Sequence, residues 1–80
     1  MLAATGVIKT ATSAECRADR SVLALSEEAY YSAKGHYTDQ ATLVRDGYID
    51  NESDLHSVEL FGGGPSSATD YVIVNESACA

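Results

Sequence analysis

The sequence predicts an α+β fold in which one long N-terminal helix packs on a small antiparallel β-sheet. Residues 12–34 combine a capping pattern with apolar side chains at helical spacing, and two runs of strand composition follow at 56–61 and 71–74. A helix followed by a hairpin is an α+β arrangement. At 80 residues the chain suffices for one domain, so we expect residues 1–80 to fold as a single unit.

The long helix is expected over residues 12–34 because both of its ends carry recognisable signals. Thr12 and Glu15 form a Thr-x-x-Glu capping box at the start. Gly35 suits the left-handed position that follows a helix, and Lys34 is favourable at the negative end of the helix dipole. Residues 1–11 precede the capping box and are mostly apolar, so they are interpreted as the remnant of a more hydrophobic helix.

Placing residues at 100° intervals groups the apolar side chains of this helix on one broad stripe, which we expect to face the core. The stripe contains Ala18, Val22, Leu23, Leu25, Ala29, Tyr30 and Ala33. Cys16 and Glu27 fall at its border, and Tyr31 falls on the polar side, where it could contact a partner.

A short second helix is expected over residues 39–46. Thr38 or Asp39 can cap its start, Leu43 and Val44 supply apolar contacts, and Gly47 ends it. The polar residues 50–54 then predict a loop.

The remaining chain predicts a β-hairpin. In the first strand, 56–61, side chains alternate loosely, whereas 71–74 is a continuous β-branched and aromatic run that is typical of a strand covered on both faces. The connection at 62–67 contains three glycines and the only proline, so a loop longer than a tight turn is expected.

Charge is distributed unevenly along the chain, whose formal net charge is −7. Residues 1–34 carry four basic and four acidic side chains, which cancel, whereas residues 35–80 carry only Arg45 against eight acidic side chains. Such an acidic surface repels phosphates, which disfavours nucleic-acid binding, and it keeps a protein soluble.

Two cysteines and two histidines are the first candidates for chemistry. Cys16, His36, His56 and Cys79 could form a Cys₂His₂ zinc site, but their spacing fits no known pattern, and two exposed histidines are the simpler interpretation. Neither cysteine lies in a nucleophile motif. Two cysteines near the ends of a small acidic chain favour a Cys16–Cys79 disulfide, and the alternative is two free thiols or thiols that pair between subunits. No catalytic, cofactor or metal residue is predicted, and no enzymatic activity is expected.

Three further motifs have simple structural explanations. The acidic stretch 46–54 offers oxygen ligands for calcium but lacks the EF-hand order, so a solvated loop is the preferred interpretation. Gly62–Gly64 precedes no Gly-Lys-Ser/Thr sequence and is no phosphate cradle. Asn51 and Asn75 begin glycosylation sequons, a pattern short enough to arise by chance.

Several short motifs, taken in order along essentially the whole chain, resemble a known family. They are Leu2-Ala3-Ala4, Cys16-x-x-Asp19, Glu28-Ala29-Tyr30-Tyr31, Gly35-x-Tyr37, Leu43-Val44, Gly47-Tyr48-Ile49, the Tyr-Val-Ile-Val run at 71–74 and Cys79 near the C-terminus. Together they resemble type IV pilin-like proteins and type II secretion pseudopilins, most of all the small pilin-like proteins of Gram-positive bacteria.

This resemblance implies a structural role, as a subunit of a pilus-like or secretion filament at the cell surface. It implies a hydrophobic helix, anchored in the membrane before assembly, that runs without a break into the amphipathic helix and holds neighbouring subunits and the assembly machinery. The family's cleavage glycine, methylated first residue and membrane-embedded glutamate are absent from the sequence, so Met1 is interpreted as an added start residue on a shortened, monomeric soluble form. The alternative function is a minor pilin-like adhesin or an extracellular ligand-binding module.

Overall fold

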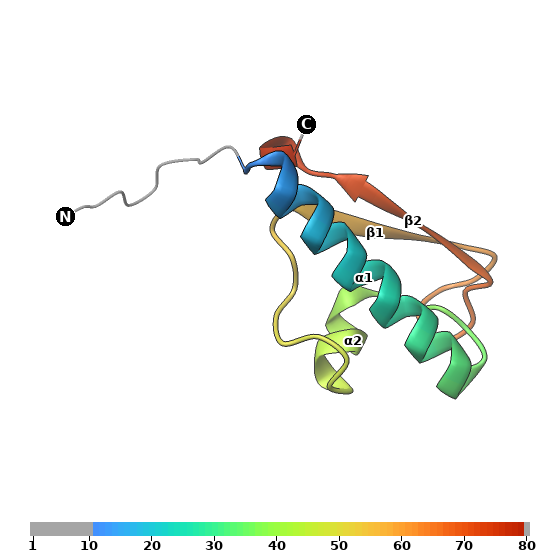
Figure 1. Ribbon diagram of the computed structural model, residues 1–80. Coiled ribbons are helices and arrows are strands. Elements are labelled where there is room, and N and C mark those ends of the chain that lie inside the picture. Colours follow the sequence, from blue (N-terminus) through green and yellow to red (C-terminus); the bar gives the residue numbers. More distant parts are fainter. Residues whose placement is uncertain (1–10, 80) are drawn as a thin grey trace.

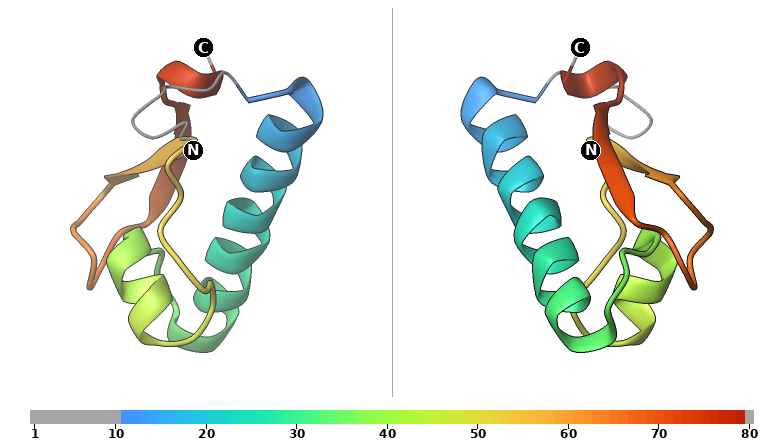
Figure 2. Two further views of the ribbon diagram at one scale, coloured as in Figure 1. Left: turned by 90° about the vertical axis from the view of Figure 1, so that its left-hand side faces the viewer. Right: turned by 90° about the vertical axis from the view of Figure 1, so that its right-hand side faces the viewer.

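The computed structural model describes residues 11–79 and has the predicted α+β class (Figure 1). Its elements are α1 (Ser13–Lys34), α2 (Gln40–Arg45), β1 (His56–Phe61), β2 (Asp70–Asn75) and a final 3₁₀ turn (Ser77–Cys79). Figure 2 shows α1 on one side of the molecule and the hairpin on the other, with α2 near the C-terminal end of α1. Among the described residues, no helix is long and apolar enough to cross a membrane.

The start of α1 differs from what the family resemblance implies. Thr12 is extended, its side chain accepts from the Glu15 N–H at 3.1 Å, and the Glu15 carboxylate accepts from the Thr12 N–H at 2.7 Å. The Ala11 N–H donates to the carbonyl of Ala78. The expectation of an unbroken helix is therefore wrong at residues 11–12, because α1 begins only after the capping residue Thr12. The prediction of a helical remnant at 1–11 lies, except for Ala11, outside the described residues.

Local signals set the turn from α1 into α2. Gly35 adopts φ 84° and donates to the Tyr31 carbonyl, which closes α1 as predicted. The Asp39 side chain accepts from the Thr42 N–H and caps α2. Gly47, at φ 83°, follows α2 and turns the chain toward the loop at 50–54.

The hairpin pairs β1 and β2 antiparallel, with Val58 opposite Ile73 and His56 opposite Asn75. Val58 and Ile73 pack against the core, so one face of the hairpin is directed inward. The other face is partly open: Val72 is 47% exposed, whereas Val74 is half-buried. The prediction that 71–74 is covered on both faces is therefore wrong, because a sheet of only two strands with α1 on one side leaves the second face in water.

The core is small, and it uses only part of the stripe predicted on α1. Its buried apolar members are Leu23, Tyr30, Leu43 and Ile49. The other five members of the predicted stripe are exposed, namely Ala18, Val22, Leu25, Ala29 and Ala33. The helix is rotated so that Ser26 and Glu27, between Leu23 and Tyr30 in sequence, are buried in their place.

Glu27 is thus a fully buried carboxylate, not a border residue. Its Oε1 accepts from the Thr38 N–H at 3.0 Å, which holds the segment after α1, whereas Oε2 is buried without a partner among the described residues. Burial raises the pKa of Glu27, and the nearby Asp39 and Glu28 act in the same direction, against the lowering effect of the Thr38 hydrogen bond.

This raised pKa predicts a pH-dependent loss of stability that the Glu27→Gln variant lacks. Because the folded-state pKa lies above the ordinary value of about 4.5, folding favours the protonated side chain. The contribution is complete below that value and is lost as the pH rises through the folded-state pKa. Urea unfolding between pH 4 and pH 8 should show wild type losing stability relative to E27Q as the pH rises. Parallel curves for the two proteins would contradict this account.

Candidate functional site

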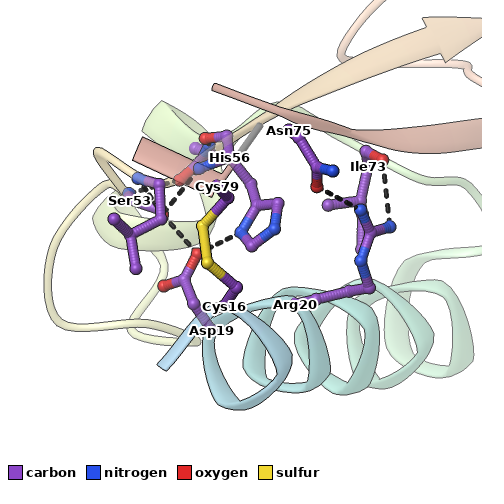
Figure 3. Close-up of polar contacts among 10 residues, drawn as sticks. Cys16, Asp19, Arg20, Ser53, His56, Ile73, Asn75 and Cys79 are labelled. Carbon is purple, nitrogen blue, oxygen red and sulfur yellow. Dashed lines mark hydrogen bonds and ion pairs between the residues drawn. A yellow bond between two sulfur atoms is a disulfide. The ribbon is translucent and has the colours of Figure 1, made fainter. Parts of the chain in front are cut away.

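A disulfide between Cys16 and Cys79 ties the end of the chain to the first turns of α1 (Figure 3). Their Cα atoms are 5.8 Å apart, and the bond spans a sequence separation of 63 residues. Cys16 lies on α1 and Cys79 ends the 3₁₀ turn after β2, which is the placement that the sequence predicts. With both sulfurs bonded to each other, neither can act as a thiolate ligand of the Cys₂His₂ zinc site considered above.

A partly buried polar cluster lies beside the disulfide and joins α1 to the start of β1. The Nδ1 of His56 is 2.6 Å from Oδ2 of Asp19, and the Ser53 hydroxyl donates to the same oxygen. Ser53 Oγ also accepts from the N–H groups of Leu55 and His56. Opposite a carboxylate, Nδ1 must carry the hydrogen. The expectation of an exposed His56 is therefore wrong, since this residue is 1% exposed and anchored by Asp19.

Asp19, Ser53 and His56 are the residue types of a hydrolytic triad, but their hydrogen bonds are not connected as in a triad. In a triad the imidazole accepts the proton of the serine hydroxyl. Here hydroxyl and imidazole both bind the carboxylate, and the remaining His56 nitrogen, Nε2, is buried with no partner among the described residues. The arrangement therefore fixes α1 against the loop at 50–54 and β1.

Arg20 makes a second polar connection, this time from α1 to β2. Its guanidinium donates to the Ile73 carbonyl at 3.0 Å and to the Asn75 side-chain oxygen at 2.6 Å (Figure 3). One side of α1 is thus attached to the rest of the domain by the disulfide, by Asp19 and by Arg20. These contacts fix which face of the helix is left uncovered.

The uncovered face of α1 is apolar along the length of the helix. We call it the apolar stripe; its members are Ala14, Ala18, Val22, Leu25, Ala29 and Ala33. All six are exposed, with Val22 at 52% and Leu25 at 71%. Spacings of three and four residues place them on one side of the helix. Beside Ala18 and Val22 the surface forms a cavity of about 430 Å³, which Leu55 helps to line.

Aromatic side chains gather at the other end of α1, around Glu28. The hydroxyls of Tyr37 and Tyr71 both donate to its carboxylate, and the ring of Tyr37 lies 4.7 Å from those of Tyr31 and Tyr71. Partial burial and the Glu28 charge raise the pKa of Tyr71 to about 12. Tyr31 is 43% exposed, and Tyr30 is buried in the core as predicted.

The other candidate sites show no shared geometry. His36 is half-buried with its ring against Tyr30, which differs from the exposed position expected of it. In the acidic stretch 46–54, Asp46 pairs with Arg45, and no three His, Cys, Asp or Glu side chains of residues 11–79 gather as metal ligands would. The glycines of the 62–67 loop lie in the connection between β1 and β2.

Comparison with known proteins adds no assignment. No family model, no curated protein and no solved structure matches the chain.

Proposed function

We propose that this protein is a structural subunit of a pilus-like or secretion filament, and that α1 packs against α1 of neighbouring copies. The apolar stripe is the observation that carries the proposal. Single exposed apolar residues need no explanation, but a continuous apolar face on a long helix is typical of a surface that is covered in an assembly. The helix has 22 residues and is about 33 Å long, and the stripe runs from its second residue, Ala14, to the last but one, Ala33.

Charge favours a second copy of the chain as the occupant of the stripe. The acidic and basic side chains of residues 1–34 cancel, whereas residues 35–80 carry the whole net charge of −7. Two copies that meet through α1 therefore avoid bringing their acidic parts together. Those parts then face outward, where they keep the assembled surface soluble.

The anchors on α1 suit this role because they hold the helix in one rotation. If α1 turned freely, Val22 and Leu25 would enter the core instead of remaining available to a neighbour. The disulfide, the Asp19–His56 contact and the Arg20 hydrogen bonds oppose such a turn. A disulfide is also typical of oxidising compartments, which supports a location at the cell surface.

The coding sequence upstream of residue 2 tests the proposal. We expect about 18–25 further, mostly apolar residues, the length that a membrane-spanning helix needs, after a short basic leader. The resemblance implies a Gly-Phe or Gly-Met junction, with a glutamate four residues further on. A native start at Met1, directly preceded by a stop codon, would contradict the proposal.

A further inference from the structure

A polar pocket opens between the first turns of α1 and the C-terminal end of the chain, on the side of α1 that carries Arg20. Its volume is about 310 Å³. Its charged and polar lining comes from Ser13, Arg17, Arg20, His56 and Asn75, and the Cys16–Cys79 disulfide forms part of its wall. Figure 3 shows most of these side chains, which come from α1, β1 and β2.

The pocket is positively charged and lacks an acidic partner of its own. No carboxylate of the described residues lines it. Arg20 donates only to a carbonyl and an amide oxygen, both neutral, and no described residue pairs with Arg17. His56 is directed to Asp19 through Nδ1, and its Nε2 is a buried atom that no described residue satisfies. No described residue therefore compensates the charge of these two guanidinium groups, in a chain whose net charge is −7.

We propose that this pocket binds a carboxylate side chain from the loop at 50–54 of a second copy of this chain. The inference rests on the proposed function, since it needs copies of the chain in contact. Asp50, Glu52 and Asp54 are exposed in that loop, and none has a basic partner among the described residues. Arginine is well suited to carboxylates because its parallel N–H groups can hold both oxygens.

The pocket and the loop are different surfaces of one molecule. No residue of 50–54 lines the pocket, and the loop is held to α1 through Ser53 and Asp19 instead. A contact between two unlike surfaces is heterologous, so a dimer still has one free pocket and one free loop. Each of these can bind a further copy, which allows an open chain to grow. The pocket would thus fix the register of copies whose helices pack through the apolar stripe.

Charge reversal on each side separately tests this contact. The Arg17→Glu variant reverses the charge of a pocket arginine that has no partner among the described residues, and it keeps the loop. A Glu52→Lys/Asp54→Lys variant reverses the charge of the loop and keeps the pocket. The soluble form is expected to be monomeric at low concentration, so sedimentation equilibrium is run at low salt and high protein concentration. Under these conditions we expect weak association of wild type, reduced about tenfold or more in either variant. An equimolar mixture of the two variants should regain association, because the intact loop of one variant can meet the intact pocket of the other.

Salt and a matched control separate this contact from packing through the stripe. Sodium chloride at 0.5 M should weaken the wild-type association, whereas apolar contacts are not screened. Lys34→Glu, an equal charge change at the far end of α1, should leave it unchanged. Loss of association in K34E as large as in R17E, or a mixture of variants that stays monomeric, would overturn the pocket proposal. Neither result depends on the coding sequence upstream of residue 2. The pocket contact and the proposed filament function can therefore fail separately.

Discussion

Replacing both cysteines with serine (C16S/C79S) is expected to lower the free energy of unfolding by about 4 kcal/mol. The bond spans a sequence separation of 63 residues, so its loss releases a large amount of chain entropy in the unfolded state. The apolar core offers little compensation, because only five apolar residues of the described chain are buried, and four of them form the cluster from α1, α2 and the segment after α2. For a domain with a total stability on the order of 5 kcal/mol, the disulfide is then the largest single contribution.

Urea unfolding followed by circular dichroism measures this effect. The oxidised wild type, the reduced wild type and C16S/C79S should be compared, with the exposed α1 substitution Ser32→Ala as the control. The reduced protein and the double variant should agree, since both lack only the cross-link, and S32A should match wild type. A difference below about 1 kcal/mol between oxidised and reduced protein would show that the disulfide is not the main constraint.

The Leu25→Asp variant is expected to lose assembly almost completely while it keeps its fold. Leu25 is 71% exposed, so the substitution should change the free energy of unfolding by no more than about 0.5 kcal/mol. In an α1–α1 contact, however, the new carboxylate would be buried without a partner, which is a large penalty. Electron microscopy of filaments from cells that express the full protein measures the outcome.

Val72→Asp is the matched control for this experiment. It makes the same apolar-to-acidic change at an exposed position, but on the open face of the hairpin instead of on α1. It should therefore assemble as wild type does. Normal filaments with L25D, or an equal loss of filaments with V72D, would show that the apolar stripe is not the contact between copies.

Sequence reasoning predicted the ends of the elements well because those ends depend on neighbouring residues. Thr12 and Glu15 meet within one helical turn, and Gly35 and Gly47 take backbone conformations that other residues rarely adopt. The disulfide could also be predicted, since a chain with two cysteines allows only one internal pairing. In these cases the determining interaction lies within the sequence pattern itself.

The rotation of α1 and the polar anchor could not be predicted in the same way. Helical periodicity predicts one broad apolar face, but it does not say that the hairpin, α2 and the segment after α2 together cover only the part around Leu23 and Tyr30. Asp19, Ser53 and His56 meet across separations of 34 and 37 residues, so no local pattern joins them. Only the fold brings them together, and it leaves Val22 and Leu25 in water.

Site-specific photo-crosslinking from Leu25 in cells that produce the full protein tests the central claim most directly. A photoreactive residue at this position should give covalent dimers and higher multiples of this chain, because in the assembly it faces α1 of a neighbouring copy. The same residue at Glu59, exposed on the hairpin, should give few or none. Adducts from Leu25 that contain only other proteins, or an absence of adducts while filaments are present, would contradict the proposed packing of α1 on α1.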